Sequence, residues 1–172
     1  MVTENSFEVL RQDADHTVGL WRNVSVNVWM SPSTAEQIRR IGADQPRIAQ
    51  RFPEGFGSLS IMHASNTGMT AEARAAGEKL SKTATPGLRA IAMVIVGTGF
   101  AAAGLRAVAS TMMMITHRRA PTKIFGDPET GARWVLEQLG ASPEQSQRDA
   151  TALLGALEAH GFRKDLEKRA SA

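Results

Sequence analysis

The sequence predicts an α/β protein with a mixed, mostly parallel sheet flanked by helices. Strand-like and helix-like patterns alternate along most of the chain after an opening β-hairpin, which is the order that this fold class requires. Residues 90–96 are apolar at every position, which is typical of a strand in a parallel sheet with helices on both faces. The turn Gly97-Thr98-Gly99 and a long apolar helix follow, so we expect this stretch to be the centre of the fold.

The composition indicates an ordinary globular protein. The chain has 172 residues, a hydrophobic content of 42% and a net charge of +3, which suit one domain with a core and a tail. It has no cysteine, which excludes disulfides, thiolate catalysis and cysteine-based metal sites and fits a reducing compartment. The start of the chain lacks a secretory signal pattern. We therefore expect a cytoplasmic protein.

The first part of the chain favours strands. Residues 7–10 and 17–21 predict a β-hairpin, and residues 24–30 alternate between apolar and other side chains, as in a strand with one face on a core. Trp29 falls on the polar side of this strand. It is a candidate contact for a partner, or it is covered by a neighbouring loop or helix.

Helices and strands then alternate up to the central stretch. Ser33 and Glu36 predict a capping box at a helix start, and Gly42 and Pro46 are expected to end or bend that helix before it continues over 47–52. Residues 56–64 predict a strand. A helix capped by Thr70 is expected to run to about residue 81.

The helix expected over 100–116 has an apolar stripe. Met113 and Met114 widen this stripe, which favours core filling, although methionine clusters also form adaptable binding surfaces. A membrane span over 90–115 is disfavoured by Arg106 and by the glycine break. The stripe consists of Ala101, Leu105, Val108, Met112 and Ile115.

The last third of the chain predicts a strand and two helices. A short strand over 122–125 precedes a helix capped by Asp127, with Gly140 just past its end. Residues 142–145 combine a capping box with proline at the first turn of the last helix, and a charged tail follows. We therefore divide the chain into a domain over 1–140 and a C-terminal helix with its tail over 141–172.

Two local patterns carry a resemblance to a known family. The pattern LRAIAMVIVG at 88–97 and the pattern TKIFGDPETGARWVLEQLG at 122–140 resemble the bacterial SpoIIAA-like domains of the STAS/SEC14 type, over about residues 5 to 140. The resemblance implies a STAS-like fold with an extra C-terminal helix, and a regulatory or binding role. Where STAS anti-sigma antagonists carry a phosphorylatable serine, the nearest match here is Ala101-Ala102-Ala103-Gly104-Leu105, so no phosphoserine switch is expected there.

Candidate binding residues come from the expected ends of the parallel strands and from a basic stretch. Ligands in open α/β sheets bind beyond the carboxyl ends of the strands, where His63 and Gly97-Thr98-Gly99 fall. The glycine turn is either an anion cradle or a plain tight turn. No acidic residue lies between Glu78 and Asp127, and the basic residues there form either a patch for an acidic partner or ordinary surface. The candidates are Trp29, His63, Gly97, Thr98, Gly99, Arg106, Arg118 and Arg119.

The sequence gives little support to catalysis, metal binding or nucleic-acid binding. His63, Ser65 and Asp127 contain the groups of a nucleophile and a base, but no nucleophile-elbow motif accompanies them. The four histidines are scattered without ligand spacing. We expect no catalytic residue, no metal and no cofactor.

Three classes of function follow, in order of preference. The first is a non-enzymatic regulatory module of STAS-like type that binds another protein, dimeric through the last helix or through a sheet edge. The second is a binder of a lipid or of another small amphiphilic or anionic ligand, which the methionine cluster and the basic stretch favour. The third is an enzyme, which requires His63 and Asp127 to converge in a cleft.

Overall fold

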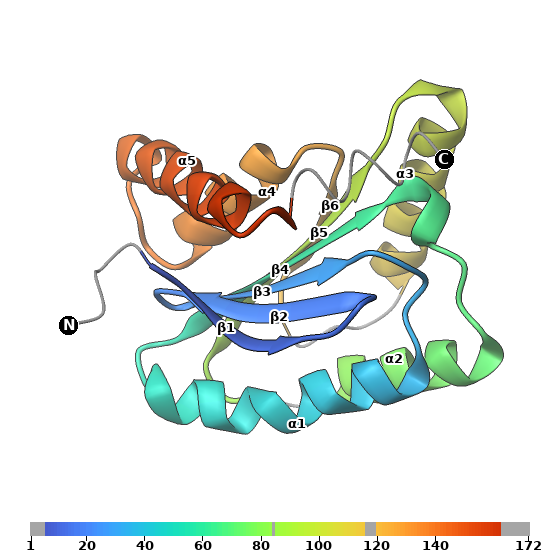
Figure 1. Cartoon of the computed structure of the whole chain (residues 1–172), viewed down its shortest axis with the longest axis horizontal. Helices are drawn as coiled ribbons and strands as arrows, with labels where there is room; N and C mark the ends of the chain where they lie inside the picture. The colour runs from blue at the N-terminus through green and yellow to red at the C-terminus, as the bar shows by residue number, and fades with distance from the viewer. Residues whose placement is uncertain (1–5, 84, 116–119, 163–172) are drawn as a thin grey trace.

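The six strands form one sheet in the same order as they occur along the chain (Figure 1). The computed structural model describes residues 6–83, 85–115 and 120–162. The first three strands pair antiparallel and the remaining pairs are parallel, so the predicted mixed, mostly parallel α/β sheet is confirmed. The strands are β1 (Phe7–Gln12), β2 (His16–Trp21), β3 (Val24–Trp29), β4 (Phe56–His63), β5 (Leu88–Val96) and β6 (Thr122–Phe125).

Helices cover both faces of this sheet. In Figure 1, α1 and α2 lie below the sheet and α4 and α5 lie above it, while α3 runs near the β6 edge. The helices are α1 (Ala35–Arg51), α2 (Ala71–Lys82), α3 (Gly99–Ile115), α4 (Pro128–Gln138) and α5 (Pro143–Ala159), with a short 3-10 helix at Ala64–Asn66. No helix in this described part of the chain combines the length and the hydropathy that a membrane crossing requires.

The largest apolar cluster lies between the sheet and the pair α4 and α5. Val26 and Val94 of the sheet and Leu153 of α5 are fully buried in it, and Phe162 beyond α5 is 2% exposed. We call this cluster the main core. The C-terminal helix, which the sequence places outside the first domain, therefore shares one core with the sheet.

The opposite face holds two smaller clusters beneath α1 and α2. One contains Leu20 and Phe56, and the other contains Trp29 and Ala73. Trp29 is only 5% exposed, its ring stacks on His16 at 3.8 Å between centroids, and its indole N–H donates to Ser60 Oγ at 2.9 Å. Of the two alternatives for Trp29, cover by a neighbouring helix is therefore confirmed and an exposed partner contact is wrong, because the helices cover this face of β3 as well.

The start and the path of α1 differ from the expectation. The capping box is formed by Thr34 and Gln37, one residue later than the predicted pair Ser33 and Glu36. The helix also continues through Pro46 without ending. Several residues near Ser33 have suitable side chains, and the sequence alone does not select the one with extended backbone angles, which is Thr34 at φ −96°.

A long-range ion pair ties α5 to the first hairpins. Arg22 lies in the tight turn between β2 and β3 with a φ of 49°. Its guanidinium donates to Asp149 of α5 at 2.7 Å and lies over the Trp21 ring at 4.4 Å. The start of α5 is thereby fixed over the sheet by a residue 127 positions away.

The predicted centre of the fold has the expected turn. Gly97 and Gly99 have φ values of 147° and 87°, which only glycine adopts readily, so the chain reverses directly from β5 into α3. Leu105 of the predicted stripe is half-buried. The side chains of the other predicted stripe residues and of the methionine cluster lie outside the described set.

Candidate functional site

A pocket of about 370 Å³ opens at the carboxyl ends of the parallel strands. We call it the main pocket. It lies where β3, β4 and β5 end, next to the start of α4 and the second half of α5. Its lining consists of Val28, Ile61, His63, Val96, Gly97, Thr98, Asp127, Pro128, Glu129, Leu154, Leu157, Glu158 and Phe162.

The walls of the main pocket are apolar. The strands contribute Val28, Ile61 and Val96, and the last helix with the residues after it contributes Leu154, Leu157 and Phe162. The strand residues occupy alternate positions, so they point to the same face as the main core. The main pocket is therefore an open extension of the main core, where α5 does not cover the sheet completely.

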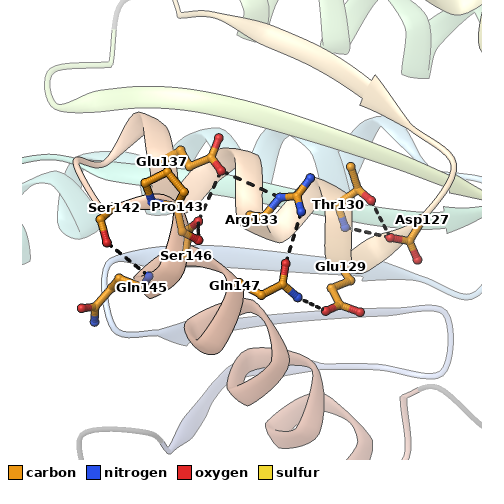
Figure 2. Close-up of polar contacts among 10 residues, drawn as sticks. All are labelled: Asp127, Glu129, Thr130, Arg133, Glu137, Ser142, Pro143, Gln145, Ser146 and Gln147. Carbon is orange, nitrogen blue, oxygen red and sulfur yellow. Dashed lines mark hydrogen bonds and ion pairs between the residues drawn. The ribbon is translucent and has the colours of Figure 1, made fainter.

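Acidic side chains stand at the start of α4 beside these walls. Asp127 caps the helix, since its Oδ2 accepts hydrogen bonds from the Thr130 amide and from Thr130 Oγ1, each at 2.8 Å (Figure 2). Glu129 accepts a hydrogen bond from Gln147 Nε2 of α5 at 2.5 Å. These bonds fix two carboxylates of the lining, and Glu158 supplies a third.

His63 stands between the main pocket and a second pocket. Its Nδ1 accepts a hydrogen bond from the Ser65 amide at 3.2 Å and lies 2.8 Å from Ser65 Oγ. In the neutral ring, therefore, the proton is on Nε2. The second pocket, of about 550 Å³, is lined by His63, Ala64, Ser65, Gly97, Thr98, Ala102 and Leu105.

The glycine turn lies between the two pockets. Because Gly97 has no side chain, the segments that carry Ala64 and Ala102 can approach it closely. A Cβ atom at Gly97 would lie 3.1 Å from the Ala64 Cβ and 3.4 Å from the Ala102 Cβ, in addition to its unfavourable φ. Arg106 of α3 donates to the carbonyl groups of Ile95 and Gly97 at 3.1 and 3.3 Å. Arg106 thus holds the end of β5 rather than lining either pocket.

The structure brings together some of the predicted site residues. His63, Gly97 and Thr98 line both pockets, and the exposed Gly99 follows them at the start of α3. Arg118 and Arg119 lie outside the described residues. Trp29, as corrected above, is buried on the other side of the sheet.

Sequence reasoning missed the wall that α5 provides. Leu154 and Leu157 belong to the apolar stripe of the last helix, but the stripe does not indicate that one of its ends stays uncovered. The burial of Phe162 was also missed, because the residues after the last helix were expected to be a charged tail. An aromatic residue directly after a helix-stopping glycine was the available signal.

The other basic residues of the acid-free stretch do not gather at the main pocket. Lys79 and Lys82 lie in the last turn of α2, and Arg89 lies at the start of β5, where it donates to the Glu54 carbonyl. These positions are at the amino ends of the parallel strands, opposite to the pocket. Lys123 of β6 stands over the Phe125 ring at 5.4 Å.

The described side chains that could take part in chemistry make local contacts. His63 and Asp127 line the same pocket, as the third class of function requires, but the hydrogen bonds described for their side chains are local capping contacts. Within residues 6–83, 85–115 and 120–162, no group of three His, Asp or Glu side chains is arranged to hold a metal ion.

Comparisons with protein-family models, with curated proteins and with solved structures gave no match to this chain.

Proposed function

We propose that the protein is a non-enzymatic binder of a small amphiphilic molecule, held in the main pocket. The observation that supports this is an apolar pocket at the carboxyl edge of a parallel sheet, with a few polar groups in its lining. Its volume of about 370 Å³ lies within the usual range of ligand pockets, about 300–1,000 Å³. An apolar tail would lie against Val96, Leu154 and Leu157, and a polar head would lie near His63 and Asp127.

The pocket is accessible without a large rearrangement. Leu154 is half-buried, and Glu158 and Asp127 are exposed, so the mouth reaches solvent between α5 and the start of α4. The walls belong to elements that are fixed by the main core and by the ion pair between Arg22 and Asp149. A preformed pocket of this kind binds without a large ordering cost.

Filling the pocket tests the proposal. Leu154→Trp places a large side chain in the mouth, and Ala159→Trp adds the same group at an exposed position of α5 outside the lining. Binding of octyl glucoside, measured by calorimetry, should be lost in Leu154→Trp and kept in Ala159→Trp. Equal binding by both variants contradicts the proposal.

A second candidate function is a regulatory module that binds another protein through α3. Phe100 at the start of α3 is 95% exposed, and the neighbouring Ala103 and Gly104 are exposed as well. Exposed aromatic groups are enriched at protein interfaces. By contrast, α5 packs on its own domain, and the edge strand β1 has a bulge between Val9 and Arg11 that disfavours pairing with another sheet.

If the protein binds another protein through α3, this binding should depend on Phe100. Light scattering on the wild type and on Phe100→Glu should show a larger mass for the wild type if α3 joins two copies. For a different partner, chemical cross-links from α3 to that partner should disappear in Phe100→Glu. Identical masses and identical cross-links in both proteins exclude this role of α3.

A further inference from the structure

One ring nitrogen of His63 carries a hydrogen-bond donor that is set by local contacts. The Ser65 amide donates to Nδ1 at 3.2 Å, and Ser65 Oγ lies 2.8 Å from the same nitrogen. Because a backbone N–H can only donate, Nδ1 has no proton, and the neutral ring carries its proton on Nε2. The two contacts also orient the ring, so the direction of the Nε2–H bond is set by the chain itself.

The Nε2 atom of His63 faces the glycine turn between the two pockets. A Cβ atom added at Gly97 would lie 3.7 Å from Nε2. Since glycine has no such atom, no side chain of the turn residue covers the donor. His63 and Gly97 both line the main pocket. The Nε2–H group is therefore next to the space that a ligand of the main pocket would fill.

This donor lacks an acceptor among the residues that the structure describes. The side-chain hydrogen bonds of His63 to that part of the chain all involve Nδ1. His63 is half-buried, so a ligand in the main pocket would shield Nε2 from water. A shielded donor costs free energy unless the ligand supplies an acceptor in place of water.

The groups beside Nε2 offer few acceptors for a hydroxyl proton of the ligand. The carbonyl groups of Ile95 and Gly97, at the end of β5, accept hydrogen bonds from Arg106 at 3.1 and 3.3 Å. Asp127 of the lining is exposed, and its Oδ2 already accepts two hydrogen bonds from Thr130. An oxygen that only accepts, such as a carbonyl oxygen, therefore fits this place better than a hydroxyl group.

We propose that His63 selects the ligand by its head group, and that this head group presents a carbonyl oxygen to Nε2, as ketones, esters and fatty acids do. This inference rests on the proposed binding function and adds the chemical class of the ligand to it. The apolar tail lies against the walls of the main pocket, and the oxygen accepts the hydrogen bond beside Gly97. Sites that bond a polar group of their ligand discriminate against analogues that lack it.

Two probes of the same shape measure this requirement. Methyl hexyl ketone carries a carbonyl oxygen, and the matching alkene has a methylene group in its place. Both are volatile, so their depletion from the vapour above a protein solution gives the two dissociation constants. Water solvates the ketone better than the alkene, so the ratio of the constants is compared between protein variants. Leu154→Trp, which fills the mouth, should bind neither probe.

Two substitutions of His63 separate the donor from the local contacts of the ring. His63→Asn keeps an acceptor near the position of Nδ1 for the Ser65 amide but has no donor at the position of Nε2. His63→Gln places an N–H donor near the position of Nε2 and gives up the contact with Ser65. Relative to the alkene, ketone binding should be about fivefold weaker in His63→Asn than in the wild type. His63→Gln should keep the wild-type ratio.

Octanoate distinguishes the two sources of such an oxygen. If octanoate binding falls in His63→Asn together with ketone binding, the head group that His63 selects is a carboxylate or a carbonyl group. If only ketone binding falls, the head group is a neutral carbonyl compound. Both results support the assigned role of Nε2.

Two results would overturn the inference and leave the proposed function intact. One is the same ratio of constants in the wild type and in His63→Asn. The other is a loss in His63→Gln with none in His63→Asn, because that pattern assigns the effect to the contact with Ser65. In both cases octyl glucoside should still bind. If neither octyl glucoside nor the two volatile probes bind to the wild type, the proposed function itself fails.

Discussion

The two faces of the sheet are covered by helices in different ways. Above the sheet, α4 and α5 close one continuous apolar cluster, the main core. Below it, α1 and α2 cover two small apolar clusters, and β3 places Ser25 and Asn27 on this face, both buried. His16 Nε2 and Asn27 Oδ1 are buried there without a hydrogen-bond partner in the described part of the chain.

This difference indicates which face of the sheet contributes most of the stability and which face makes stability depend on pH. Apolar burial stabilises regardless of pH, whereas a buried polar group contributes only while its state fits its surroundings. The upper face therefore provides most of the stability and also the pocket, and the lower face should respond to pH and to small changes in hydrogen bonding.

The largest expected effect concerns the main core. Leu153→Ala removes a fully buried side chain from the centre of the upper face and should lower the free energy of unfolding by about 4 kcal/mol. Ile48→Ala, in a small cluster of the lower face, should cost about 2 kcal/mol. Denaturant titration of both variants measures these losses. An equal loss in both would remove the energetic distinction between the faces.

The lower face should make stability depend on pH through His16. Burial lowers the pKa of His16 to about 4 from its usual 6.5, although Asp13 pulls in the opposite direction. The unfolded chain thus binds more protons than the folded one between these two values. Stability contributed by His16 is complete above pH 6.5 and is lost as the pH falls to about 4, by about 3 kcal/mol in total.

Unfolding titrations between pH 4 and 7 should show this slope for the wild type. The variant His16→Gln lacks the titrating ring and should show a flatter dependence over the same window. A slope that persists unchanged in His16→Gln would assign the pH dependence to other groups.

A smaller effect is expected for the hydrogen bond between Trp29 and Ser60. Trp29→Phe keeps most of the ring but removes the indole N–H that donates to Ser60 Oγ at 2.9 Å. The loss in stability should be about 1 kcal/mol. A double-mutant cycle with Ser60→Ala isolates the bond, and a coupling energy near zero would show that it contributes nothing.

An effect of similar size at Thr34, and the smallest one at Ser33, concern the start of α1. Thr34→Ala removes the capping oxygen and should cost about 1 kcal/mol, whereas Ser33→Ala should change stability by only about a few tenths of that. Thermal unfolding of the two variants compares the observed cap with the one that the sequence favours. A larger loss in Ser33→Ala would reverse the assignment.

Local patterns predicted most of the fold because they depend on neighbours in the chain. The apolar run before Gly97, the cap at Asp127 and the cap at Ser142 were placed correctly, since each rests on backbone preferences within a few residues. For Trp29 the sequence left two alternatives open, because the choice between a partner contact and cover by a helix depends on the helices that come to lie over β3.

Only the part of the main pocket that the strand ends form could be predicted, because it too depends on local patterns and chain order. The strand ends at His63 and Gly97 follow from chain order and from the rule that parallel strands end on one edge. The walls from Leu154 and Phe162 arise only when α5 folds back over the sheet, and their distance along the chain from His63 hides this contact. Whether a ligand occupies the pocket stays a prediction.

The ion pair between Arg22 and Asp149 joins an early and a late part of the chain, which has a consequence for folding during synthesis. The N-terminal hairpins emerge early, but the helix that covers Phe7 and Trp21 is made more than a hundred residues later. During that interval these aromatic side chains are not yet covered by α5, since chains grow at about 5–20 residues per second. Once α5 has been made, it packs over the hairpins in one late step of folding.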